Sequence, residues 1–182
     1  MKVTLDSITT KITKGTTPTS VGYVFEESGI NFIKSESLRN SRCIDTSKFA
    51  FISEQTHEKL KRSQIEVNDI LFSMAGMFLG KTGIVTADIV PANTNQAVAI
   101  IRINPAKANY KYIYYYLNQS EVIKKINSLS AQSAQPNINL KQIGQISVEL
   151  PTIENQEKIV SILSKIDDKI ENNNKINNNL AA

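Results

Sequence analysis

The sequence contains few of the side chains from which most catalytic sites are built. It has one histidine, His57, and one cysteine, Cys43. A histidine-based triad or a zinc site would need both residues, and they lie far apart with no metal-ligand spacing. We therefore expect no catalytic site, no metal and no cofactor. A single cysteine also excludes an intramolecular disulfide framework and agrees with a reducing cytoplasm.

Long hydrophobic segments are also missing. No apolar run approaches the roughly 18 residues of a transmembrane helix, and the start, MKVTLD, lacks the apolar region of a signal peptide. The chain has 182 residues, of which 41% are apolar and 21% charged, as in a globular domain with room for an appendage. Its net charge of +4 and its pI near 9.1 favour a polyanionic partner such as nucleic acid.

The nearest approach to an enzyme motif is GMFLGKT at residues 76–82. A phosphate-binding loop requires GxxxxGKS/T, and here the first glycine lies one residue too close. That loop must also lead into a helix whose dipole faces the phosphates, whereas residues 82–85 continue as a strand. A nucleotide-dependent enzyme built on this loop is therefore a weak alternative. It predicts that the chain binds ATP, which a calorimetric titration would detect. The methyltransferase motifs are absent too, so another chain would perform any DNA chemistry.

Residue patterns predict an α+β fold. Residues 3–14 alternate weakly, and strands are expected within residues 29–34, 67–73, 84–85, 96–103 and 143–150. Helices are expected at residues 53–61, with Ser53 as N-cap, and at 110–117 and 120–129. Residues 35–42, 91–95 and 131–139 are expected to be loops. Residues 1–150 should therefore form a globular domain of short irregular strands and a few helices.

The last segment, residues 151–182, has the pattern of a long coiled-coil-type helix. Thr152 is the expected N-cap, and Glu154–Lys158 and Glu171–Lys175 are favourable i, i+4 pairs. At about 1.5 Å per residue, a helix over residues 153–180 is roughly 40 Å long, more than a body of this size needs. We expect it to meet another helix through a heptad stripe whose members are Ile159, Leu163, Ile166, Ile170, Asn173, Asn177 and Leu180.

Polar loops supply side chains suited to reading DNA. Arg and Lys pair with guanine, Asn and Gln with adenine, and Ser and Thr reach bases or phosphates. The same residue types also satisfy backbone groups in turns, and this structural alternative stays open for each position. The candidate DNA contacts are Lys14, Thr16, Thr17, Lys34, Ser35, Arg39, Asn40, Ser73, Lys81, Asn93, Asn95, Gln96, Gln135 and Asn137. The tyrosines at 112 and 114–116 could stack on bases, but on a helix they are more simply explained by packing.

The order of the motifs is more specific than any one of them. The motifs are ITKGTTP (12–18), GINFIK (29–34), DILFS (69–73) followed by Gly76, Gly80 and Lys81, NQAVAI (95–100), AQPNI (134–138), and LP (150–151) followed by Gln156, Ile159, Val160 and Leu163. In this order they resemble the DNA-specificity (S) subunit family of type I restriction–modification systems, over essentially the whole chain.

The resemblance implies a target-recognition domain at residues 1–150 and a spacer helix at 151–180. Complete S subunits have two such repeats, whose antiparallel helices set the distance between two half-sites. They are non-catalytic, bind double-stranded DNA, and dock methyltransferase (M) subunits and, through these, restriction (R) subunits. The loop with Gln135 and Asn137 matches a family motif, while the other candidate contacts rest on loop chemistry because base-reading residues vary within the family.

This sequence has one repeat instead of two. It is either half of a longer subunit or a half-subunit that forms a homodimer through its helix, and both interpretations stay open. A rival from another functional class is an assembly module that binds M subunits or partner helices without reading DNA. Co-purification with M without sequence-selective DNA binding would favour this rival.

Overall fold

Strand β8 (Val98–Ile103) is the central strand of the body. The structure is a computed structural model that describes residues 1–39, 41–130 and 137–180. In it, β8 pairs antiparallel with β2 (Thr9–Lys14) on one side and with β5 (Ile70–Ser73) on the other. β5 in turn pairs with β6 (Thr82–Ile84). The β-branched, apolar sequence of β8 explains why this strand could be predicted.

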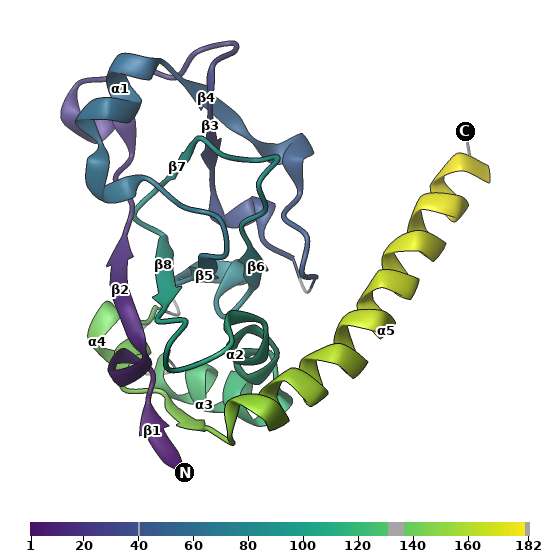
Figure 1. Ribbon diagram of the computed structural model, residues 1–182. Coiled ribbons are helices and arrows are strands. Elements are labelled where there is room, and N and C mark those ends of the chain that lie inside the picture. Colours follow the sequence, from purple (N-terminus) through teal and green to yellow (C-terminus); the bar gives the residue numbers. More distant parts are fainter. Residues whose placement is uncertain (40, 131–136, 181–182) are drawn as a thin grey trace.

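A second sheet lies at the opposite end of the body from the chain's N-terminus (Figure 1). Its central strand, β3 (Ile30–Ile33), pairs antiparallel with β4 (Ala50–Ile52) and parallel with β7 (Ala92–Thr94). The prediction of a loop at residues 91–95 is wrong for β7. All three β7 residues are buried. The pairing with β3 is a long-range interaction that local composition does not contain.

Two helices match their predicted positions closely. α2 (Tyr110–Leu117) and α3 (Ser120–Ser130) cover one face of the four-stranded sheet together with α4 (Leu140–Gly144) (Figure 1). α2 is capped by Asn109, whose side-chain oxygen accepts the backbone N–H of Lys111 at 2.9 Å. Its Tyr112 and Tyr114 side chains are buried, in agreement with a packing role.

The strand predicted at residues 143–150 is shorter than expected. α4 occupies the chain as far as Gly144, and only β9 (Ser147–Glu149) is a strand, paired with β1 (Lys2–Thr4). A capping box explains this correction: the Asn139 side chain accepts the N–H of Gln142, and the Gln142 side chain accepts the N–H of Asn139, each at 2.9 Å.

Single helical turns connect several of these elements. They are η1 (Asp6–Ile8), η2 (Pro18–Val21), η3 (Ser35–Ser37), η4 (Thr46–Lys48), η5 (Lys61–Ser63) and η6 (Gly76–Phe78). The last helix, α5 (Ile153–Leu180), has the predicted length and slants away from the body (Figure 1). The Thr152 hydroxyl accepts the N–H of Asn155 at 3.4 Å, and Glu154 pairs with Lys158 at 2.6 Å, as predicted.

Alternate residues of β5 and β8 pack into two different cores. Phe72 and Ile101 face α2, α3 and α4, while Leu71 and Ile100 face the segment around Leu38 and the second sheet. Successive side chains of a strand point to opposite faces, so one sheet can serve both cores. The four-stranded sheet is therefore the scaffold that holds both layers together.

A buried aspartate, Asp69, forms an ion pair with Arg102. Arg102 of β8 donates to the buried Asp69 carboxylate at 2.8 and 2.9 Å, and Asp69 also accepts the N–H of Glu66 at 2.7 Å. The hydrogen bond from Arg102 to Asp69 raises the pKa of the Arg102 guanidinium above its ordinary value. The aspartate of the DILFS motif is thereby explained by structure, because its charge is compensated in the interior.

Replacing Ser53 with alanine is expected to lower the free energy of unfolding by about 1 kcal/mol. Ser53 precedes α1 (Glu54–Lys59), and its hydroxyl oxygen accepts the N–H of Thr56 at 3.2 Å. Urea unfolding would measure the change. Ser53→Asp is the control, because aspartate is also a good N-cap; equal loss in both variants would show that the cap is not the cause.

Candidate nucleic-acid interface and helical arm

Three candidate loops start at the same end of the four-stranded sheet. β2 ends at Lys14, which lies opposite Ala99, near the start of β8. β5 ends at Ser73, opposite Val98, and the Ser73 N–H donates to the carbonyl of Lys81 at 2.8 Å. The loop after β2, the turn before β8 and the loop between β5 and β6 are therefore neighbours.

Hydrogen bonds join the loop after β2 to the turn before β8. The N–H of Thr16 donates to the Thr94 carbonyl at 3.1 Å, and the Thr17 hydroxyl donates to the side-chain carbonyl of Gln96. A Cβ at Gly15 would lie 1.9 Å from the Thr94 oxygen, so this close approach of two backbones requires glycine. The two polar loops thus form one continuous surface.

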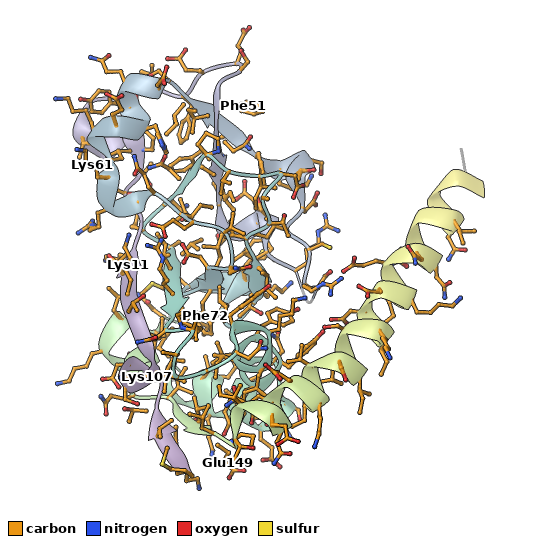
Figure 2. The ribbon with its side chains drawn as sticks, in the orientation of Figure 1. Lys11, Phe51, Lys61, Phe72, Lys107 and Glu149 are labelled. Carbon is orange, nitrogen blue, oxygen red and sulfur yellow. The ribbon has the colours of Figure 1, made fainter. Side chains whose placement is uncertain are left out.

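Cationic side chains border this surface. Lys14 is exposed, and Arg62 of η5 donates to the Thr16 hydroxyl at 2.9 Å. Lys61, next to Arg62, is exposed as well; Figure 2 shows Lys61 and Lys11 on the side of the body away from α5. Lys61 and Arg62 were not among the predicted contacts because they belong to a segment interpreted as a helix end. Only the fold brings them within reach of the hydroxyl-rich loop.

The loop between β5 and β6 completes the surface. Ala75 forms an antiparallel bridge with Asn137, and the N–H of Met74 donates to the Ala97 carbonyl at 2.8 Å. These contacts bring Asn137, which is exposed, beside the turn before β8. Lys81 is half-buried, with its ammonium 5.2 Å from the centre of the Phe78 ring. We call this set of three loops, together with Lys61, Arg62 and Asn137, the sheet-end surface.

The other candidate contacts are buried, are paired within the protein, border the sheet-end surface or lie outside the described residues. Asn93 and Ser73 are buried, and the Asn93 amide donates to the Leu60 carbonyl at 3.1 Å. Arg39 is paired with Asp45. The parallel register of Ile33 with Thr94 places Lys34 and Ser35 next to Asn95. Asn40 and Gln135 lie outside the described residues. The contacts with DNA of all these residues stay predictions.

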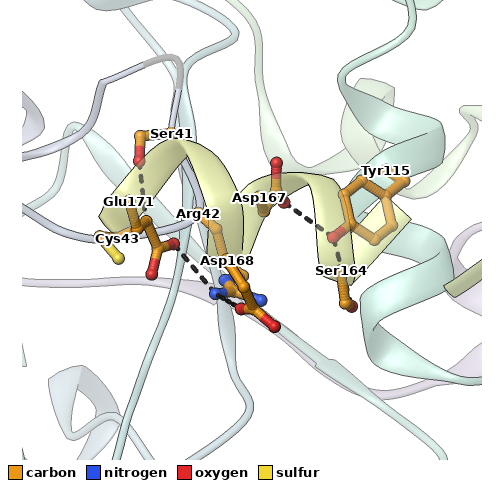
Figure 3. Close-up of polar contacts among 8 residues, drawn as sticks. All are labelled: Ser41, Arg42, Cys43, Tyr115, Ser164, Asp167, Asp168 and Glu171. Carbon is orange, nitrogen blue, oxygen red and sulfur yellow. Dashed lines mark hydrogen bonds and ion pairs between the residues drawn. The ribbon is translucent and has the colours of Figure 1, made fainter. Parts of the chain in front are cut away.

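The face of α5 that meets the body buries Val160 in the main core and otherwise makes polar contacts. Gln156 is buried, and its side chain accepts the N–H of Asn109 at 2.9 Å and donates to the Pro151 carbonyl at 2.8 Å. Further along, Tyr115 of α2 donates to Asp167 at 2.7 Å (Figure 3). The neighbouring Asp168 and Glu171 bind Arg42 of the body, while the side chain of Lys175, the predicted partner of Glu171, lies outside the described set.

Five isoleucines from the second turn of α5 onward are exposed, and one of them, Ile170, also borders the pocket lined by Arg42, Tyr115 and Asp167. Ile159, Ile162, Ile166, Ile170 and Ile176 have exposed fractions between 38% and 63%. Leu163 is half-buried, and Asn173 and Asn177 are exposed; the side chain of Leu180 is outside the described set. We call the exposed isoleucines the isoleucine stripe. Its members Ile162 and Ile176 were missed because the predicted heptad followed Leu163 and Asn177 instead.

Metal-binding clusters and membrane-spanning helices are both absent from the described ranges, 1–39, 41–130 and 137–180. These ranges hold no group of three histidine, cysteine, aspartate or glutamate side chains placed to bind a metal ion. They also hold no helix with the length and apolar character needed to cross a membrane.

A family model described as the type I restriction modification DNA specificity domain matches residues 1–182. The chain is 31% identical over 137 residues to the type I restriction enzyme EcoBI specificity subunit of Escherichia coli, covering 72% of this chain and 27% of that subunit. It is 26% identical over 152 residues to the putative type I restriction enzyme MjaX specificity subunit of Methanocaldococcus jannaschii, covering 81% and 35%. The chain thus spans about a third or less of these curated relatives.

Solved structures of such subunits share the fold. The crystal structure of the HsdS subunit from Thermoanaerobacter tengcongensis superposes with a TM-score of 0.66 at 20% identity, covering 94% of this chain and 38% of that one. A chain from a study of complex assembly and conformational transition of the type I R-M system gives a TM-score of 0.68 at 19% identity, covering 97% and 40%. Together with the match of the family model along its whole length, these similarities show that the chain belongs to the type I restriction–modification DNA-specificity family.

Proposed function

We propose that this chain is a non-catalytic recognition subunit that reads one half of a bipartite DNA site. Residues 1–150 form the recognition domain, and residues 151–182 form an arm that pairs with a second copy. The observation that carries the proposal is the sheet-end surface, where loops from distant parts of the sequence place hydroxyls, amides and cations side by side. Methyltransferase subunits would dock on the assembled dimer, as the family relationship suggests, and would supply the chemistry in the cytoplasm.

The side chains of the sheet-end surface divide into two groups by chemistry. Lys14, Lys61 and Arg62 are cations at its border, suited to phosphates, which position a protein on DNA without reading its sequence. Gln96 and Asn137 are exposed amides, which can contact a base edge with a donor and an acceptor. In the absence of DNA, Gln96 is held by the Thr17 hydroxyl, and binding would exchange this contact for one with a base.

Pairing of two arms is supported by the isoleucine stripe. Exposed apolar side chains along successive turns of one helix are typical of a helix that packs against another. The chain spans about 40% of the solved relatives it matches, a length that holds one recognition domain and one arm. We assign the stripe to a second copy of this chain.

Selection from a random duplex library tests the proposal. At a fixed salt concentration, the protein together with the matching M subunit is expected to enrich one duplex sequence. Its affinity for DNA should fall steeply as the salt concentration rises, because binding releases counterions from the phosphates. Absence of any preferred sequence at every salt concentration contradicts the DNA-reading function. If M still co-purifies in that case, the chain is an assembly module instead.

Single substitutions separate the two groups of side chains. Lys14→Ala is expected to weaken binding to all duplexes alike and to lower the slope of log affinity against log salt by about one unit. Gln96→Ala should instead relax the preference at one base pair. Lys107→Ala is the control, since Lys107 is exposed near the opposite end of β2 (Figure 2). The same slope in the Lys14 and Lys107 variants would exclude Lys14 from the phosphate contacts.

A further inference from the structure

Arg42 connects the recognition domain to the middle of the arm. It lies between η3 and η4, and its Nη2 donates to Asp168 Oδ1 at 2.7 Å and to Glu171 Oε1 at 3.0 Å (Figure 3). Asp168 and Glu171 are three residues apart and so share one side of α5. The Arg42 and Glu171 side chains are 16% and 25% exposed, so this pair is better shielded from water and salt than an ordinary surface pair, whereas Asp168 is 59% exposed.

The segment that carries Arg42 is fixed to the body. The Arg42 carbonyl accepts the N–H of Ile84 at 3.0 Å, which extends the edge of the four-stranded sheet beyond β6. On either side of it, Leu38 and Ile44 are buried in the core that also contains Leu71. The guanidinium is therefore attached to a rigid part of the recognition domain, so it can hold the helix in place.

The segment also starts beside the sheet-end surface. Lys34 and Ser35 follow β3 directly, next to Asn95, and the chain then crosses the second core to reach Arg42. Only a few residues of sequence thus separate the proposed DNA-reading loops from the residue that binds the arm. If DNA binding displaces these loops, it would also move the segment whose Arg42 binds α5.

Other polar contacts hold the arm at earlier turns. Gln156 is anchored at the base of the arm, and Tyr115 binds Asp167 one residue before Asp168. Hydrogen bonds between fixed groups prefer defined distances and angles, whereas apolar surfaces can slide on each other. The arm is therefore held in one direction by contacts at its base and near its middle.

We infer that Arg42 fixes the angle between the arm and the recognition domain, and thereby the distance between the two half-sites that a dimer reads. The second part rests on the proposed function. An arm about 40 Å long that swings by about 10° moves its far end by about 7 Å. Since B-DNA rises about 3.4 Å per base pair, such a swing changes the spacing by about two base pairs. Arg42 is thus a positioning residue that contacts no DNA itself.

Pulsed electron paramagnetic resonance tests the angle directly, because it measures the distance between two spin labels on one chain. Glu58 on α1 and Asn172 on α5 are exposed, and each is replaced by a non-natural amino acid that bears a ketone. The spin labels react with the ketones, so the thiol of Cys43 is not labelled. Labelled chain is mixed with excess unlabelled chain so that only intrachain distances contribute. Arg42→Ala is expected to widen the distance distribution at least twofold, and an unchanged distribution overturns the inference.

Two further variants make this comparison specific. Arg42→Lys keeps the charge but places it as a strongly hydrated ammonium on a flexible stem, so we expect an intermediate width. Arg39→Ala removes an arginine of the same segment that pairs with Asp45 instead of the arm, so it should leave the distribution unchanged. Equal widening in the Arg39 and Arg42 variants would mean that loosening of the segment, and not loss of the grip on α5, is the cause. Circular dichroism confirms that each variant is folded.

Duplexes with two selected half-sites at different separations test the consequence for DNA. The unsubstituted protein should prefer one spacing at least fivefold over spacings two base pairs longer or shorter, and Arg42→Ala should lose this preference while binding a single half-site as before. A retained preference overturns the role in spacing. If the unsubstituted protein selects no bipartite site, the proposed function fails, while the spin-label distances still decide whether Arg42 sets the arm angle.

Discussion

A variant with alanine at position 15 is expected to lose about 3 kcal/mol of unfolding free energy, a large part of the 5–15 kcal/mol that stabilises an ordinary domain. The added methyl group would lie 1.9 Å from the Thr94 oxygen and 2.6 Å from the Asn95 oxygen. Both are backbone atoms, so no side-chain rotation relieves the overlap. The loop after β2 must therefore separate from β7 and from the turn before β8.

The same separation should remove the sheet-end surface. The hydrogen bonds from Gly15 to Val98 and from Thr16 to Thr94, at 3.3 and 3.1 Å, cannot both form once the backbones move apart. Urea unfolding measures the stability, and duplex selection on the folded fraction measures the loss of sequence preference. Gly15→Ala with unchanged stability and unchanged selectivity would contradict the close approach of the two loops.

Gly22→Ala is the matched control for this prediction. Gly22 follows η2 with φ of +83°, and a Cβ added there would meet nothing within 4 Å beyond its chain neighbours, so alanine costs backbone strain alone. That strain amounts to about 1 kcal/mol for a left-handed residue. A similar loss in both variants would indicate that generic glycine effects, and not the contact with Thr94, determine the stability.

Replacing Ile166 with aspartate is expected to abolish dimers. Ile166 lies in the isoleucine stripe, and burying it against a second arm contributes about 2 kcal/mol per chain. Both chains carry the change, so the loss is about 4 kcal/mol, or about three orders of magnitude in dissociation constant. The carboxylate adds a desolvation cost to this figure. Light scattering over a range of concentrations measures the mass of the particle.

Asn172→Asp adds the same negative charge to an exposed position outside the stripe. This control should keep the dimer mass, and helix content should remain equal in both variants by circular dichroism. Unchanged mass for Ile166→Asp would place the pairing surface elsewhere on the chain. A monomeric mass for the unsubstituted protein would remove the homodimer from the proposal and leave recognition of DNA to be judged by duplex selection.

Local signals predicted the bounds of α2 and α5 well, but not α4. α2 has the expected bounds because aromatic and apolar residues follow a polar cap, and α5 has the expected length although its exposed stripe departs from the predicted heptad. Such features depend on residues within one or two turns. The order of motifs also indicated the family without any structural information, because it samples the whole chain.

Long-range pairing was beyond this kind of reasoning. β7 consists of Ala92, Asn93 and Thr94, whose composition is that of a turn, and only its parallel partner β3 makes it a strand. The contact of Glu171 with Arg42, far away in the sequence, also has no local signal. Convergence of the candidate loops at one sheet end likewise depends on the order β2-β8-β5-β6, which local patterns do not specify.

The pairing of β1 with β9 brings the two ends of the proposed recognition domain together. Lys2 lies opposite Glu149, and Met1 and Leu150 exchange backbone hydrogen bonds at 2.8 and 3.2 Å, so the chain enters and leaves the domain at one point. A domain closed in this way can be grafted onto another arm with both junctions at the same place. Specificity and spacing could then be inherited separately, one from the grafted domain and the other from the arm that receives it.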